Sequence, residues 1–120
     1  MFSPSSSDLH PEQRRSRRFP FDSLVRVTAF RLGEETLLWG HSTDLCREGI
    51  GMTVAGDLTP EELVAMQIPL PAEAMNVRAS VRYRNQLHCG FEFVDLRDRQ
   101  RRAIQSACER LRTRLKSGQR

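Results

Sequence analysis

Between residues 24 and 94 the chain alternates short apolar stretches with turn residues. This pattern is typical of antiparallel strands rather than helices. The clearest turns are the segments 33–34, 55–57 and 84–86, which contain glycine or small polar residues. The apolar stretches predict six strands, at residues 24–31, 36–42, 49–54, 64–70, 74–84 and 87–94.

The last two predicted strands alternate most regularly, and only three residues separate them, so we expect a hairpin. Polar residues, with Arg84 at the end, fill one face of 74–84. Six short antiparallel strands in about 70 residues most naturally close into a small barrel. The predicted inward residues of the hairpin are Val77, Ala79, Val81, Tyr83, Leu87, Cys89, Phe91 and Phe93.

Two helical segments are also predicted. Thr59–Glu62 has the composition of one helical turn, with Thr59 as N-cap and Pro60 at the first position. After Asp95 the apolar residues recur at helical spacing and predict an amphipathic helix over about residues 98–116. We expect its apolar stripe to cover the mouth of the barrel, with docking on a partner protein or pairing with a second copy as the alternatives. We expect Trp39, the single tryptophan, in the core.

Length and composition fit one globular domain, with 120 residues, 38% hydrophobic and 28% charged. No apolar run approaches the roughly 18 residues of a membrane span, and no secretory signal is visible, so we expect a cytoplasmic protein without membrane insertion. Three cysteines form an odd number without CxxC spacing, which favours reduced thiols. Neither cysteine nor histidine spacing indicates a metal site or a cofactor.

Charge divides the chain into three parts. Residues 1–20 carry 4 − 2 = +2, residues 21–95 carry 6 − 11 = −5, and residues 96–120 carry 9 − 2 = +7. Anionic partners should therefore meet the two ends. All cations except Lys116 are arginine, a bias that a GC-rich genome would also produce.

The segment boundaries follow from these patterns. The Ser- and Pro-rich residues 1–12 predict a flexible leader, and the arginine-rich residues 13–20 predict a mobile arm. The arm and barrel together span 13–96, and 97–120 form the helix and tail of the same domain.

Two segments carry candidate chemistry. In Arg14-x-x-x-Arg18, with Arg15 beside it, planar guanidinium groups can bind a phosphate or guanine O6 and N7. In the predicted turn, Asp44 offers a carboxylate that suits the N–H donors of guanine, and Gly49 allows a tight bend.

Together, in this order and at this separation, the segments resemble the PilZ family, whose pattern is an RxxxR arm followed by a D/N-x-S-x-x-G turn. This chain has Arg14-x-x-x-Arg18 followed by Asp44-x-Cys46-x-x-Gly49, and its final hairpin and arginine-rich helix also agree. The resemblance covers about residues 12–116. It implies a six-stranded antiparallel β-barrel with a C-terminal amphipathic helix, acting as a stand-alone receptor for cyclic di-GMP and not as an enzyme.

The resemblance also implies the site. Arg14, Arg15 and Arg18 would bind guanine and ring phosphates, and Asp44 and Cys46 would hydrogen-bond the ligand. Gly49 would permit its approach. Because Cys46 replaces the family serine and a thiol is a weaker donor, we expect an affinity loss of about 0.5–1.5 kcal/mol, against about 1.5–3 for an arginine contact.

The signal would pass to an effector protein, in a pathway such as motility or biofilm formation. Two alternatives stay open. The chain is a degenerate PilZ adaptor that has lost the nucleotide, or it binds nucleic acid through its basic ends. The acidic middle and the lack of an aromatic stacking platform make nucleic acid the weaker alternative. Both a monomer and a homodimer fit the sequence.

Overall fold

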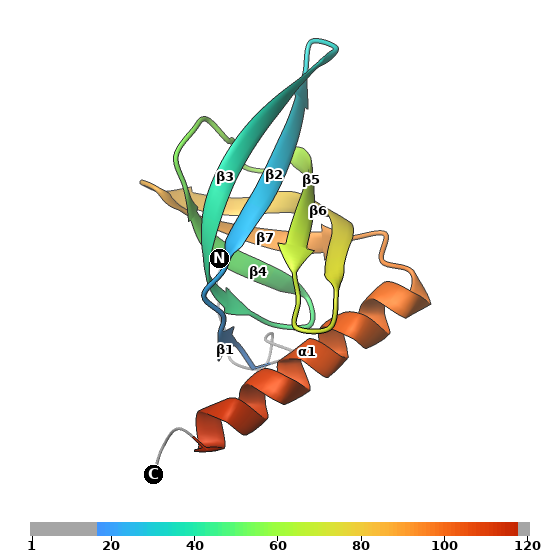
Figure 1. Ribbon diagram of the computed structural model, residues 1–120. Coiled ribbons are helices and arrows are strands. Elements are labelled where there is room, and N and C mark those ends of the chain that lie inside the picture. Colours follow the sequence, from blue (N-terminus) through green and yellow to red (C-terminus); the bar gives the residue numbers. More distant parts are fainter. Residues whose placement is uncertain (1–16, 118–120) are drawn as a thin grey trace, which may run out of the picture.

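A computed structural model describes residues 17–117 as seven strands followed by one helix (Figure 1). The elements are β1 (Phe19–Pro20), β2 (Leu24–Arg31), β3 (Glu34–Leu45), β4 (Gly49–Val54), β5 (Leu63–Pro69), β6 (Ala74–Asn85), β7 (His88–Val94) and α1 (Asp98–Ser117). The strands pair antiparallel in the order β1-β3-β2-β5-β6-β7-β4. A further pairing of β3 with β4 closes β2–β7 into a six-stranded barrel, which confirms the predicted fold.

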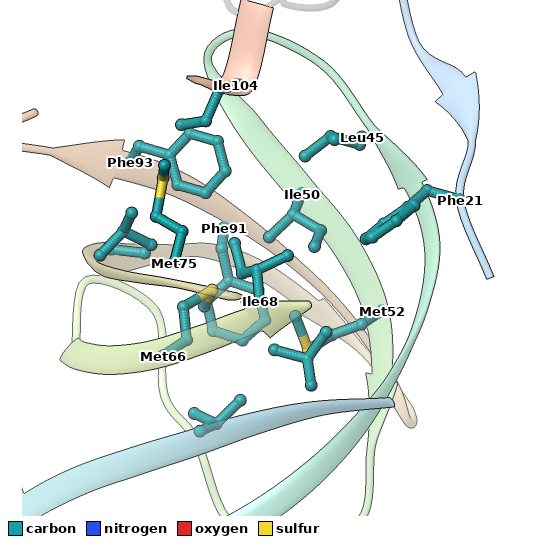
Figure 2. Packing of buried hydrophobic residues seen from close by; sticks show 14 of the residues in the cluster. Phe21, Leu45, Ile50, Met52, Met66, Ile68, Met75, Phe91, Phe93 and Ile104 are labelled. Atoms are coloured by element: carbon teal, nitrogen blue, oxygen red, sulfur yellow. The ribbon is translucent and has the colours of Figure 1, made fainter. Parts of the chain in front are cut away.

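The barrel interior is filled by the inward residues of every long strand. On β2 these are Val25, Val27 and Ala29, all fully buried. Figure 2 shows the aromatic and methionine side chains of the other strands converging on the same interior. Burying apolar surface of this kind is the main favourable contribution to folding.

Helix α1 closes one end of the barrel, as predicted, and lies across it beside β1 and the β5–β6 connection (Figure 1). Its first turn is fixed by Gln100, whose Oε1 accepts from the backbone N–H of Arg97 at 2.7 Å. Nε2 of Gln100 also donates to the carbonyl of Asn76 on β6 at 2.7 Å. Within the described residues no helical segment combines the length and hydrophobicity that a membrane span needs. The stripe that α1 buries is Ile104, Ala107, Cys108 and Leu111.

Residues 59–62 form a tight turn instead of the predicted helical turn. The backbone N–H of Glu62 donates to the carbonyl of Thr59 at 3.1 Å, while Oε1 of Glu62 accepts from the backbone N–H of Thr59. Glu61 has a φ of 73°, a left-handed conformation that cannot continue a helix. The chain therefore reverses at once into β5.

Two apolar residues expected in the core lie outside it. Trp39 is 52% exposed, because on β3 it shares the outward face of the register with Arg26 of β2. Leu87 is 57% exposed, because it belongs to the turn that precedes β7. The apolar character of each segment correctly indicated a strand, but it did not show that Trp39 faces outward or that Leu87 lies in the turn before its strand.

Candidate ligand-binding site

The arm reaches the barrel through β1, which pairs with the end of β3 and sets Pro20 opposite Asp44. This pairing brings Arg18 beside Asp44, and Nη1 of Arg18 donates to both carboxylate oxygens at 3.2 Å. Burial opposes the charge of Arg18, but the charge and hydrogen bonding of Asp44, together with smaller effects of Cys46 and Tyr83, outweigh it, so the pKa of the guanidinium is raised. Arg14 and Arg15, the other arginines predicted to bind, lie outside the described residues.

Asp44 reaches the outer surface of the barrel through a β-bulge in β3. The register shifts between Ser42 and Asp44, which leaves Thr43 as an extra residue. Regular alternation would turn Asp44 inward with Ser42, whereas the extra residue turns it outward and sends Leu45 into the core. Asp44 thus belongs to a strand, where Gly51 lies opposite it, and not to the turn in which the sequence placed it.

Tyr83 reaches the same surface through a second bulge, in β6. The register shifts between Val81 and Tyr83, with Arg82 as the extra residue. Tyr83 therefore faces outward and Arg84 inward, where Nη2 of Arg84 donates to the carbonyl of Val54 at 3.2 Å. The predicted faces of these two residues were wrong, because alternation in sequence does not reveal a bulge.

Two glycines form the floor between Asp44 and Tyr83. Asp44, Gly51, Gly90 and Tyr83 are successive neighbours across β3, β4, β7 and β6. A Cβ on Gly51 would lie 2.6 Å from Oδ1 of Asp44, and one on Gly90 would collide with the ring of Tyr83. The backbone N–H of Gly51 also donates to Oδ1 of Asp44 at 3.1 Å. Only glycine leaves room for both side chains to lie over this floor.

His88 extends this cluster along β7. Its ring stacks on that of Tyr83, with centroids 5.8 Å apart. Nδ1 of His88 is hydrogen-bonded to the hydroxyl of Tyr83 and Nε2 to the hydroxyl of Thr43, each at 3.3 Å. Burial raises the pKa of Tyr83, Arg18 lowers it and Asp44 raises it, so these groups share one electrostatic environment. We name Arg18, Asp44, Tyr83 and His88 the arm face.

Cys46 and Gly49 shape the turn behind the arm face. The backbone N–H of Cys46 donates to the carbonyl of Gly49 at 3.0 Å, and a Cβ on Gly49 would collide with the carbonyl oxygen of Phe91. Burial raises the pKa of the Cys46 thiol, while hydrogen bonds from the backbone of Glu48 and Gly49 lower it. The sulfur thus faces the backbone of its own turn. On α1, burial raises the pKa of Cys108 to about 11.

A basic groove lies between the arm and α1, next to the arm face. Arg17, Arg47 and Arg112 are among the residues that line it. The guanidinium of Arg17 sits 5.6 Å from the centre of the Phe19 ring, and Arg112 pairs with Glu109 at 3.4 Å. The groove therefore gathers a second group of arginines, separate from Arg18, at the side of α1.

The arrangement suits an anionic purine ligand. Guanidinium groups bind phosphate, a carboxylate accepts from the guanine N–H donors, and a tyrosine ring offers a surface for a base.

Of the residues on the arm face, sequence reasoning identified Arg18 and Asp44 but missed Tyr83 and His88. The available signal was Gly90, a glycine inside a strand of bulky residues, which marks a close approach by another group. Within the part of the chain that the structure describes, no group of His, Cys, Asp and Glu could hold a metal ion.

Solved structures of PilZ domains resemble this fold. The PilZ domain of YcgR from Escherichia coli, solved with c-di-GMP, superposes with a TM-score of 0.71 at 14% identity, covering 90% of this chain and 99% of that one. The PilZ domain of CeSA from a cellulose-synthesizing bacterium gives 0.60 at 20% identity, covering 74% and 91%. The Bacillus subtilis inhibitor of motility MotI/DgrA gives 0.61 at 19% identity, covering 90% and 53%. At these identities the likeness establishes the fold.

No curated protein matches the sequence. The family model of the PilZ domain, in contrast, matches residues 12–110, which include the arm, the entire barrel and most of α1. The chain therefore belongs to the PilZ domain family.

Proposed function

We propose that this protein is a cytoplasmic receptor that binds cyclic di-GMP on the arm face and relays the signal to an effector protein. The observation that carries the proposal is the convergence of Arg18 and Asp44 beside Tyr83, over a floor of two glycines. Two bulges are needed to build this arrangement, and bulges concentrate next to functional sites. Membership in the PilZ family and the c-di-GMP-bound domain of YcgR support the same ligand.

Each half of the ligand has a proposed complement. The two phosphates take guanidinium groups from Arg14, Arg15 and Arg18, which bind as charge-assisted forks. A guanine edge takes the carboxylate of Asp44, which has acceptor positions to spare beyond its bonds to Arg18 and to the backbone of Gly51. Bound there, the ligand would bridge the arm and the barrel, which already meet where β1 pairs with β3. The chemistry requires no bond to be made or broken, as expected of a receptor rather than an enzyme.

The outer side of α1 is the proposed surface for the effector. Arg102 is exposed there, Arg101 and Arg110 lie exposed on its two flanks, and none of the three forms an ion pair with any residue that the structure describes. The helix also lines the basic groove beside the arm, so movement of the arm would reach this surface directly. Motility and biofilm formation are the proposed outputs.

Isothermal titration with cyclic di-GMP tests the proposal. We expect binding to the wild-type protein and a loss of roughly 10- to 100-fold in affinity for Asp44→Ala, since a charge-assisted contact contributes about 1.5–3 kcal/mol. Asp57→Ala in the β4–β5 loop is the matched control and should bind as the wild type does. Cyclic di-AMP is the control ligand and should bind weakly, because adenine lacks the N1–H and N2–H donors. Equal affinity of all variants for cyclic di-GMP would contradict the site.

A second candidate is an adaptor that docks on its partner without nucleotide. The replacement of the family serine by Cys46, together with the mutual pairing of Arg18 and Asp44, favours it. The same titration separates the two, because the adaptor would show no heat of binding with cyclic di-GMP at any protein concentration.

A further inference from the structure

The outer surface of β5, β2 and β3 carries apolar side chains that the barrel does not need. Phe30, Leu37 and Trp39 lie on the outward face of the β2–β3 hairpin, and the pairing of Ala29 with Val64 brings Leu63 level with Phe30. We name Phe30, Leu37, Trp39 and Leu63 the hairpin face. All four are between 52% and 59% exposed.

The core does not explain these residues. The inward positions of β2 are already apolar and fully buried, so the outward positions are free to be polar. A group of large apolar side chains exposed together on one surface typically marks an interaction site. Figure 1 shows that the β2–β3 hairpin rises away from α1 and β1, so this surface is separate from the arm face.

Polar residues divide the hairpin face into two complementary halves. The central cross-strand pair is Thr28 with Leu37. Two residues to one side lies the pair Arg26 with Trp39, and two residues to the other side lies the pair Phe30 with Glu35. Each half thus presents one aromatic ring and one charge, and the two charges have opposite signs and lie on opposite strands.

The two charges have no partner of their own. Arg26 and Glu35 form no ion pair among residues 17–117. They are separated by four residues along the strands, about 13 Å, which is too far for an ion pair within one chain. A single chain therefore holds an unpaired cation and an unpaired anion at the two ends of one apolar surface.

We propose that the hairpin face binds a second copy of this chain, in a two-fold dimer whose axis crosses the strands at Thr28 and Leu37. This rotation places Leu37 on Leu37 and exchanges the two halves of the surface. Arg26 of one copy then lies over Phe30 of the other copy. Glu35 of that other copy is the cross-strand neighbour of this Phe30, so it lies one strand to the side of Arg26. This lateral offset is about 5 Å, the spacing at which neighbouring side chains interact. The same contact occurs twice, as the symmetry of a closed dimer requires.

The charges and the exposed apolar side chains of this surface therefore both favour a second copy of the chain as the partner. The surface has one positive and one negative group, so it offers no net charge to an acidic or basic partner. Its own copy, in contrast, satisfies both groups and covers all of the exposed rings at once. The dimer goes beyond cyclic di-GMP recognition, because the arm face is no part of it.

Analytical ultracentrifugation of the protein without nucleotide tests the dimer, from micromolar to near-millimolar concentration. We expect a concentration-dependent dimer, accompanied by a blue shift in the fluorescence of Trp39, the only tryptophan in the chain. Arg26→Glu and Glu35→Arg should each weaken dimerisation at least tenfold, because each turns two attractive contacts into repulsive ones. The double variant should return to within about threefold of the wild type.

Arg101→Glu on α1 is the control, since it changes an exposed arginine outside the hairpin face and should leave the dimer unaffected. A protein that stays monomeric throughout overturns the proposal, even if the hairpin face captures another protein. A dimer that the charge exchange does not restore also overturns it. Neither result concerns cyclic di-GMP, whose binding is measured separately.

Discussion

The arm face and the hairpin face lie on the outside of the same barrel and share strand β3, yet they are built in opposite ways. The second half of β3 presents Asp44 on the arm face, whereas the first half presents Leu37 and Trp39 on the hairpin face. The arm face depends on two bulges and two glycines that interrupt the sheet. The hairpin face has an unbroken register.

The difference shows how backbone regularity selects a kind of partner. A bulge turns a side chain to the opposite face of its strand, and here it lets groups from three strands and the arm converge on a small ligand. An unbroken register spaces side chains evenly and makes a smooth surface, which suits another protein. One barrel therefore offers two kinds of site without any change of topology.

The first prediction compares the hairpin face with the core and has the largest expected effect. Phe91→Ala should lower the free energy of unfolding by about 3–5 kcal/mol, since it removes a buried ring (Figure 2). Trp39→Ser should change it by only about 0.5 kcal/mol in dilute protein, since the indole is already half exposed. Urea denaturation followed by circular dichroism measures both. Similar losses would show that Trp39 belongs to the core.

The second prediction concerns the charge on the arm face. Arg18→Ala should weaken cyclic di-GMP binding roughly 10- to 100-fold, because the variant loses a charge-assisted contact. Arg78→Ala, which removes an exposed arginine paired with Asp95 at 3.8 Å, is the matched control. Trp39→Ser should also bind normally. If Trp39→Ser loses cyclic di-GMP binding and Arg18→Ala keeps it, the ligand binds on the hairpin face and not on the arm face.

The third prediction concerns the glycine floor. Gly90→Ala should lower the affinity for cyclic di-GMP roughly tenfold, because the added methyl group displaces the ring of Tyr83. Gly33→Asn at the tip of the β2–β3 hairpin is the control, since asparagine tolerates the φ of 79° and nothing lies within 4 Å. Titration and thermal unfolding of both variants separate a loss of binding from a loss of fold. Unchanged binding by Gly90→Ala would remove Tyr83 from the site.

The fourth prediction has the smallest expected effect. Cys46→Ser should change the affinity for cyclic di-GMP by less than about threefold, at the low end of the change expected from the sequence, because the side chain faces the backbone of its own turn. The hydroxyl is the better acceptor for the N–H groups of Glu48 and Gly49, so the thermal stability should rise slightly. Cys108→Ser, under the helix, is the comparison variant. A large gain in affinity for Cys46→Ser would instead show direct contact between this position and the ligand.

Local pattern was sufficient to predict most of the fold. The six barrel strands and the helix occur where apolar spacing placed them, because each must bury one face against a common core. The two motifs predicted that Arg18 and Asp44 belong to one site, but neither their direct ion pair nor strand β1 within the predicted mobile arm was predicted. The faces of Tyr83 and Arg84 were predicted wrongly, because one extra residue in a strand moves every following side chain to the opposite face of the sheet.

The sequence alone determined which segments become strands, where the helix begins and which family the motifs resemble, because hydrophobic period and residue type are local properties. The tertiary structure alone decided which apolar residues stay outside and which polar ones meet. Trp39 and Val27 are equally apolar in the sequence, and only the register sends one outward and the other into the core. Likewise, Asp44 and Tyr83 converge because distant strands become neighbours and two bulges rotate them, and both effects depend on the closed barrel.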